Sequence, residues 1–279
     1  MKEILLFGGL FFFSVIAHAQ FSDKVIIGAM SSICSNTSAS SSALSVVNNP
    51  SSMSEIKQGV LSVISARPFG FSKWNASSIS VIGLGNRLKY GGYCWYEKVH
   101  SYSSISLSSV FAKSIGTKMD VGVNFHFSKE SVAHYFSTSQ IGSDFGYRYK
   151  ISSKTLVSIS MINLIATNLK KASGSGMSGN GVSSKLISSF SYKPFSKISL
   201  AIALEKEYHQ IPNIAIGVDY HLHTVSSLRL GVSTSTQTFF SSFTFKFKKK
   251  ELTVMESYHQ QLGFSSGLQF SYFFSNKNE

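Results

Sequence analysis

The side chains of Asp120, Asn124 and His126 are of the types that carry out acid–base chemistry, and they follow one another at even spacing in one short segment. A hydrolytic site needs a nucleophile, a base within hydrogen-bond reach of it, and a group that orients the base. These three residues and His134, with many serines nearby, are the best candidates for such a site. Serine is so abundant that some hydroxyl would lie near them by chance, and no nucleophile elbow is apparent. We therefore expect a polar cluster of Asp120, Asn124 and His126 and no enzymatic activity.

Two other motifs suggest binding chemistry, but neither has the full pattern. His221 and His223 flank one residue at an expected tight turn, and a His-x-His pair without a carboxylate or a third histidine is weak evidence for a metal site. The glycine-rich stretch 174–181 lacks the Lys-Ser/Thr end and the following helix of a phosphate-binding loop. The sequence therefore predicts no metal site and no cofactor.

Cys34 and Cys94 are the only two cysteines in the chain. In an oxidising compartment they could form a disulfide that ties the N-terminal segment to the third expected strand. Strand 88–97 has aromatic residues or glycine on both faces, so its sequence does not indicate which way Cys94 points. A disulfide and two free thiols both remain open.

The segment around the expected polar cluster alternates between two kinds of side chain. One set is large and apolar, namely Met119, Val121, Val123, Phe125 and Phe127, and the other is Asp120, Gly122, Asn124 and His126. The same period of two recurs in about fourteen short segments after residue 56, including 198–205, 214–220, 239–247 and 268–274. This pattern predicts an all-β fold, a transmembrane antiparallel up-and-down β-barrel whose polar set, including the cluster, lines the lumen.

A secreted soluble β-sandwich is the alternative fold, because a period of two does not by itself show which face meets water. Only 14% of the residues are charged, which is low for a soluble surface. A soluble sandwich would also bury its large side chains, whereas here the small and polar set is the one that fits an interior. The composition therefore favours the barrel.

Connections between the expected strands alternate in length. The even-numbered ones are short, such as 114–116, 151–153 and 248–249, and most odd-numbered ones are longer, such as 67–75, 128–137 and 163–182. Bacterial barrels have short periplasmic turns and longer outer loops. The lengths therefore predict that both termini of the barrel are periplasmic.

The N-terminal part of the chain divides into two regions before the barrel. Residues 1–19 have the pattern of a cleaved signal peptide, with Lys2, an apolar run and the small-residue sequence Ala17-His18-Ala19. Residues 20–56 are rich in serine and alanine, and Asn49 followed by Pro50 predicts the cap and first position of a short helix. We expect 20–56 to be a hatch folded into the barrel, with a disordered periplasmic tail as the alternative, and 57–279 to be the barrel.

The formal net charge of +13 indicates an anionic partner or surroundings. An exported barrel is not expected to bind nucleic acid. A lysine cluster at one expected periplasmic turn would attract anionic lipid headgroups, and it consists of Lys246, Lys248, Lys249 and Lys250. Outer-membrane lipid is therefore an expected partner, and solvated strand ends are the alternative.

Several segments carry a family resemblance. Gly28 and Ala29 in IIGA, and Asn49 and Pro50 in VNNPS, flank the serine-rich stretch before the first strand. Further motifs are RPFG at 67–70, FSYKPFSK at 190–197, GVDY at 217–220, LGV at 230–232 and YHQQLG at 258–263. Together they resemble the PorV and PorQ group of outer-membrane barrels, which is related in architecture to the FadL fatty acid transporters. The resemblance assigns Gly28, Ala29, Asn49 and Pro50 to the hatch.

Two functions follow from this resemblance. It implies a non-enzymatic accessory of type IX protein secretion or of the surface attachment of cargo, with secretion components or exported cargo proteins as partners. The alternative is a FadL-like channel, with a hydrophobic small molecule as partner, which would need an apolar path through the lumen. We expect the inner face to be mostly Ser, Gly and Ala, which disfavours such a path. Both functions place the protein in the bacterial outer membrane.

Overall fold

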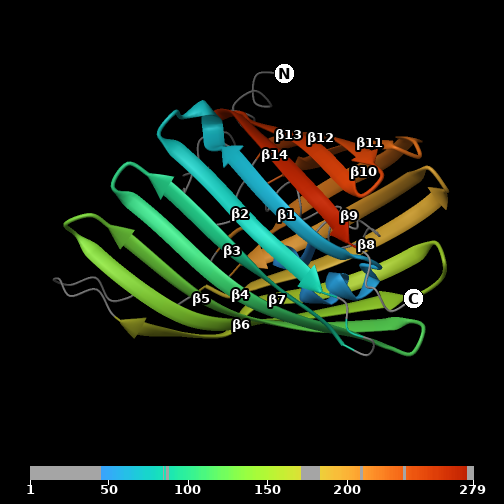
Figure 1. Ribbon diagram of the computed structural model, residues 1–279, viewed down its shortest axis with the longest axis horizontal. Coiled ribbons are helices and arrows are strands. Elements are labelled where there is room, and N and C mark those ends of the chain that lie inside the picture. Colours follow the sequence, from blue (N-terminus) through green and yellow to red (C-terminus); the bar gives the residue numbers. More distant parts are fainter. Residues whose placement is uncertain are drawn as a thin grey trace, which may run out of the picture.

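The computed structural model describes residues 45–83, 85, 88–170, 183–207, 210–234 and 237–274. They form a closed barrel of fourteen antiparallel strands, in which each strand pairs with its sequence neighbours and β1 pairs with β14 (Figure 1). The expected fold class and the expected strand number are therefore confirmed. The expected signal peptide 1–19, and Gly28, Ala29 and Cys34, lie outside the described residues.

The strands are β1 (Gly59–Arg67), β2 (Trp74–Gly83), β3 (Lys89–Val99), β4 (Tyr102–Ile115), β5 (Met119–Val132), β6 (Phe136–Lys150), β7 (Thr155–Lys170), β8 (Lys185–Phe195), β9 (Ile198–Glu207), β10 (Asn213–His223), β11 (Ser226–Ser233), β12 (Thr238–Phe247), β13 (Lys250–His259) and β14 (Gly263–Phe274). Neighbouring strands pair antiparallel, and the register of β1 on β14 over nine residue pairs closes the sheet.

Burial alternates along the strands as the sequence predicts. In β13 the exposed residues Leu252, Val254 and Tyr258 alternate with the buried residues Thr253, Met255 and Ser257. The same holds around the barrel: large apolar side chains cover most of its outer surface, while many serines and most of the acidic residues point inward. A continuous apolar surface of this kind is stable only in contact with lipid. This arrangement excludes the soluble sandwich.

No helix within the described ranges is long and apolar enough to span a membrane.

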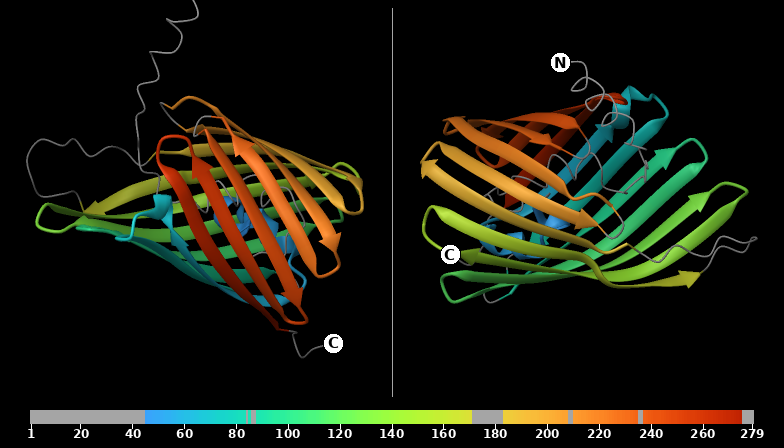
Figure 2. Two further views of the ribbon diagram at one scale, coloured as in Figure 1. Left: turned by 90° about the horizontal axis from the view of Figure 1, so that it is seen from above. Right: turned by 180° about the vertical axis from the view of Figure 1, so that it is seen from behind.

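The wall is higher on one side of the barrel than on the other. Strands β4 to β7 have 14 to 16 residues, whereas β11 has 8, and Figure 2 shows their ends projecting beyond the neighbouring strands. The expected long connection 128–137 is wrong, because β5 and β6 stay paired as far as Val132 and Phe136 and a turn of three residues joins them. The connection between β5 and β6 lies at one end of the barrel. We call the other end the short-turn end; it carries the connections β2–β3, β4–β5, β6–β7, β8–β9, β10–β11 and β12–β13.

Residues 45–56 lie inside the barrel at the short-turn end, and we call them the inner segment (Figure 1). The expected short helix after Asn49 is present as the 3₁₀-helix η1 (Pro50–Glu55), preceded by the helical turn α3 (Ser45–Asn48). Asn49 Oδ1 accepts the backbone N–H of Ser51 at 3.0 Å, which caps η1. The apolar side chains of the inner segment pack against Val60, Ile82, Tyr93, Val110 and Ala112 of the barrel wall.

The outward face of β13 provides a test of its contact with lipid. We expect Val254→Arg to destabilise the folded barrel by about 2–4 kcal/mol, the cost of a cation near the middle of the bilayer. Urea titration in lipid vesicles would measure this loss, and Val254→Leu is the control that keeps the position apolar. Equal stability of the two variants would show that this face does not meet the hydrocarbon.

Candidate functional site

The inner wall carries a continuous apolar band from β9 through β12 and β13 to β3. It consists of Ile64, Ala66, Ala76, Trp95, Ala201, Ala215, Phe240 and Met255. Two glycines make room for its largest members: a Cβ on Gly231 would lie 1.9 Å from the ring of Phe240, and a Cβ on Gly267 would lie 3.3 Å from Met255. Half of the band's members are alanines, as the sequence led us to expect of the inner face, but Ile64, Trp95, Phe240 and Met255 add large apolar side chains that the sequence did not predict there.

The opposite inner wall, formed by β4 to β8, is polar. Its buried residues are mostly serines, together with Asp120, Asn124, His126, Asp144 and Arg148. The lumen is thus amphipathic: one side combines the apolar band with serines and the buried acids Glu97, Glu205, Asp219 and Glu251, and the other side is mostly polar. Amphipathic cavities with a few placed polar groups are typical of small-molecule sites.

Asp144 is the centre of a polar cluster on this wall. Its carboxylate accepts the side-chain amide of Asn124 at 2.7 Å and the backbone N–H of Asn163 at 2.8 Å, and it lies 3.6 Å from Nδ1 of His126. The amide of Asn124 also reaches the hydroxyl of Tyr93 at 3.3 Å. Asn124 and His126, predicted to lie together, do share this cluster. Asp144 was missed, although it continues the polar face of the neighbouring strand at the same period of two.

Asp120 does not join this cluster. It lies nearer the short-turn end, where its carboxylate accepts the hydroxyl of Ser114 at 2.6 Å and lies 3.5 Å from Nζ of Lys150. The expected cluster of three is therefore two separate sites on one strand face. Asp120 belongs with the charged residues that hold the inner segment.

Strand β7 is distorted beside the Asp144 cluster. Ser143 pairs with Ile165 and Phe145 pairs with Met161, so the three residues Ile162 to Leu164 lie opposite Asp144 alone. Asn163 has a positive φ of 54°, which is uncommon for a residue other than glycine, and its N–H bonds the Asp144 side chain. Pairing of β7 with β8 ends at Ile162, and in the described part of the chain β7 continues beyond it paired with β6 alone.

A row of small residues forms the seat of the inner segment. Ala112, Gly122, Gly146 and Ser160 are cross-strand neighbours on β4 to β7. A Cβ on Gly122 would lie 2.4 Å from Pro50, and one on Gly146 would lie 2.2 Å from Asn49 Oδ1. The hydroxyl of Ser160 donates to the carbonyl oxygen of Asn48 at 2.6 Å. The backbone at Asn49 and Pro50 thus lies directly on the wall, where larger side chains would displace it.

Three cations of the wall bind the end of η1. Nη2 of Arg148 and Nζ of Lys150 each lie 3.1 Å from the Glu55 carboxylate, and the ammonium of Lys89 donates to the carbonyl oxygens of Ser54 and Ile56. Arg148 is fully buried, so Glu55 is the counter-charge that its burial requires. Burial alone would raise the pKa of Glu55, but the charges of Arg148 and Lys150 outweigh it, and this pKa lies below its ordinary value.

The described residues do not have the geometry of a hydrolytic site. At 3.6 Å, His126 and Asp144 are farther apart than a hydrogen bond allows. Gly263 to Gly267 has the glycine-x-serine-x-glycine spacing of a nucleophile elbow, but it lies within β14, and Ser265 accepts the backbone N–H of Phe69 at 2.9 Å. No group of three or more His, Cys, Asp or Glu in these residues could hold a metal ion.

Cys94 faces outward on β3, between its cross-strand neighbours Ile79 and Leu107, which are both exposed on the lipid side. Cys34, its expected partner, lies outside the described residues, so their disulfide stays a prediction.

Comparison with known proteins shows likeness in fold. No protein-family model matches the chain, and no curated protein matches it in sequence. Among solved structures, the monoaromatic hydrocarbon channel CymD matches with a TM-score of 0.62 and 12% identity, over 84% of this chain and 94% of that one. The Pseudomonas putida toluene transporter TodX matches with a TM-score of 0.59 and 9% identity, over 86% and 96%. A Pseudomonas aeruginosa FadL homologue matches with a TM-score of 0.50 and 9% identity, over 81% and 92%.

The small-residue seat yields a test. We expect Gly146→Val to expel the inner segment while the barrel remains folded, because the new side chain would occupy the position of Asn49. Hydrogen exchange of the amides of 45–56 should become fast, and exchange in the barrel strands should not change. Gly267→Ala is the control, because its added Cβ would lie 3.3 Å from the flexible end of Met255 and away from the inner segment. Continued protection of 45–56 in Gly146→Val would contradict the proposed seat.

The lowered pKa of Glu55 predicts a dependence on pH. A carboxyl whose pKa is lower in the docked state stabilises docking above its ordinary value of 4.5, and this contribution is lost as the pH falls through the docked pKa. We therefore expect a nitroxide at exposed position 57, introduced by Lys57→Cys in a chain with both native cysteines changed to Ser, to become mobile below pH 4.5.

With Glu55→Gln the same label should be mobile at every pH, because the ion pairs with Arg148 and Lys150 are then absent. Glu207→Gln, at the other end of the barrel, should keep the wild-type pH profile. A Glu55→Gln profile that still changes near pH 4.5 would assign the titration to another group.

Proposed function

We propose that the protein is an outer-membrane channel for small apolar molecules, with the inner segment as part of a hatch that plugs its lumen. The observation that carries this proposal is the apolar inner band, because an aqueous pore has no need of buried Trp95, Phe240 and Met255 in its wall. The likeness in fold to channels for monoaromatic hydrocarbons supports it.

The two walls give the channel its selectivity. An apolar molecule that leaves water gains about 25 cal/mol for each Å² of surface that it buries on the band. On the facing wall the buried charges of Asp120, Asp144 and Arg148 have partners within the protein, so they attract charged solutes weakly. We infer that this lumen favours uncharged molecules with aromatic or alkyl surface over sugars and ions.

The hatch has to leave its seat or change shape for a molecule to pass. It is held by its apolar packing on the barrel wall and by a few polar contacts, chiefly those of Glu55 and of the Asn48 carbonyl, on a seat of small residues. The ion pairs lie at one end of the inner segment, so their loss would release η1 first.

A secretion accessory of the PorV type was the preferred function from the sequence. It required a broad outer surface made by the connections 128–137 and 163–182. In the structure 128–137 is mostly paired strand, and 163–170 belongs to β7, while 171–182 lie outside the described residues. None of the structural neighbours named above is described as a secretion protein, so we favour the channel.

Substitution of Phe240 tests the channel. We expect Phe240→Asn to weaken the binding of toluene to the purified protein by about tenfold, or ~1.4 kcal/mol, which is near the lower end of what one buried apolar side chain contributes. Equilibrium binding in detergent and uptake into proteoliposomes would measure the change. Phe239→Asn is the matched control, because Phe239 is the next residue on the same strand and points outward.

Two results would contradict this function. Toluene that does not bind the wild-type protein would exclude the channel for monoaromatic molecules. An equal loss of binding in the Phe239 and Phe240 variants would show that toluene binds at the outer surface or that both variants are misfolded. Heat-modifiable mobility on gels separates these two causes.

A further inference from the structure

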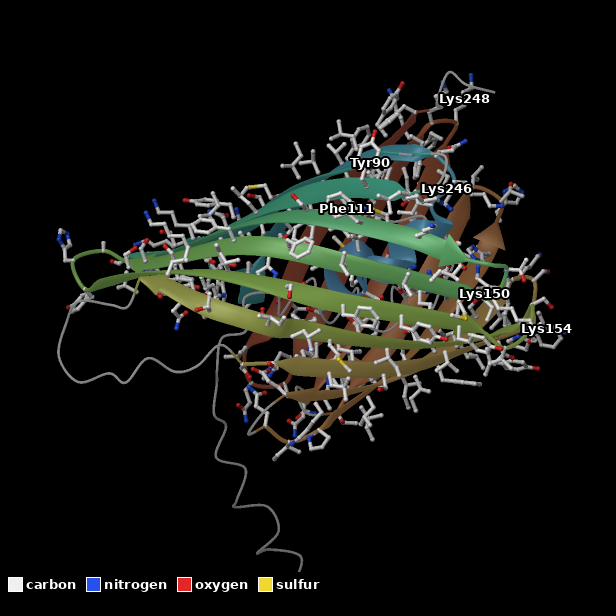
Figure 3. All side chains as sticks on the ribbon, turned by 90° about the horizontal axis from the view of Figure 1, so that it is seen from below. Tyr90, Phe111, Lys150, Lys154, Lys246 and Lys248 are labelled. Carbon is white, nitrogen blue, oxygen red and sulfur yellow. The ribbon has the colours of Figure 1, made fainter. Side chains whose placement is uncertain are left out.

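Eight exposed lysines lie at the short-turn end of the barrel, and we call them the basic collar. They are Lys113, Lys118, Lys154, Lys193, Lys197, Lys248, Lys249 and Lys250. They belong to the hairpins β4–β5, β6–β7, β8–β9 and β12–β13, which are spread around the barrel. Figure 3 shows Lys154 and Lys248 of the collar at this end, far apart on the rim, with Lys150 and Lys246 nearby. The positive charge therefore follows the perimeter and is not confined to one side.

Acidic residues at the same end are turned inward. Glu55, Asp120, Asp219 and Glu251 are buried or partly buried, and they pair with inner-wall cations, namely Arg148, Lys150, Arg229 and Lys246. None of these ion pairs includes a collar lysine. Within the described ranges, no exposed Asp or Glu lies at the short-turn end. The charge of the collar is thus not balanced by the protein itself.

Aromatic residues of the lipid face border the collar. Phe111 precedes Lys113 by two residues, Tyr192 precedes Lys193, and Phe247 precedes Lys248, and all three aromatic side chains are exposed. Figure 3 shows Phe111 and Tyr90 on the outer surface of the wall that leads to this end. Aromatic rings on barrels mark the boundary between hydrocarbon and headgroups. The collar lysines therefore lie at the depth of the lipid phosphates.

The other end of the barrel has a much smaller excess of positive charge. Exposed Arg67, Lys73, Lys98, Lys129 and Lys206 lie there together with exposed Glu256, the partly exposed Glu130 and Glu207, and the buried Glu97 and Glu205. The chain therefore concentrates its uncompensated charge at one of its two membrane boundaries. A general excess of lysine on a basic protein would not produce this asymmetry.

We propose that the basic collar binds the headgroups of anionic phospholipids in the leaflet around the short-turn end. Lysine ammonium groups bind phosphate as point charges, and their long stems can lie along the apolar surface below. A protein partner would contact one side of the rim, whereas lipid surrounds all of it, as the collar does. The bound lipids would fix the depth of the barrel and hold the hatch end of the lumen at the headgroup level.

The test compares two triple variants with the same change in charge. Lys118, Lys154 and Lys197 of the collar are changed to Gln in one, and Lys73, Lys98 and Lys129 of the other end in the second. Each protein is folded into vesicles of phosphatidylglycerol and phosphatidylethanolamine, extracted in mild detergent and analysed by native mass spectrometry. Heat-modifiable gel mobility confirms that each barrel is folded.

We expect the wild type and the second variant to retain phosphatidylglycerol over phosphatidylethanolamine. The preference of the collar variant for phosphatidylglycerol should be at least about fivefold weaker than that of the wild type, because one lysine near an anionic surface has an effect of this size. A collar variant that retains the wild-type preference would overturn the proposal. An equal loss in both triple variants would also overturn it, because the effect would then follow net charge and not the collar.

Discussion

Closure of the sheet is the constraint on which the rest of this structure depends. Hydrocarbon offers no hydrogen-bond partners, so every N–H and C=O of a spanning strand must be paired within the protein. The register of β1 on β14, from Gly59 with Phe274 to Arg67 with Ser266, removes the two free edges that fourteen strands in a row would leave. With the backbone satisfied, each strand has one face toward lipid and one toward the lumen. The period of two in the sequence is the result.

Contact with lipid requires apolar side chains on the outer face only. The residue types of the inner face can therefore differ from one side of the barrel to the other. On β9 to β3 it carries the apolar band among serines and a few buried acids, and on β4 to β8 it is mostly polar, with serines and buried charges. Gly122 and Gly146 show the consequence of this freedom, since their missing side chains let the backbone at Asn49 and Pro50 lie against the sheet. The buried charge of Arg148 is tolerated because Glu55 arrives with the inner segment. Wall and inner segment therefore depend on each other.

Features set by neighbouring residues could be predicted from the sequence, and features set by register could not. The faces of β5 and the cap at Asn49 follow from local spacing, and both are present. Asp144 was missed because its approach to Asn124 depends on how β6 pairs with β5. The inward positions of Trp95 and Tyr93 could not be predicted, because β3 has aromatic residues on both faces and alternation could not choose between them. The length of β5 and β6 beyond residue 128 was missed because polar residues at the membrane boundary resemble a loop.

The distortion of β7 lies at the point where its pairing with β8 ends, and the bonds of Asp144 give the reason for it. The Asp144 carboxylate accepts the backbone N–H of Asn163, which in a regular sheet would bond a neighbouring strand. The three residues of β7 opposite Asp144 therefore depart from regular pairing with β6. Pairing of β7 with β8 ends at Ile162, the residue before Asn163. Bulges of this kind are common beside functional sites, where they redirect a strand. The polar cluster and the distortion of β7 are therefore one structural unit, since the Asp144 carboxylate beside Asn124 and His126 also bonds the backbone of β7 at the point where its pairing with β8 ends.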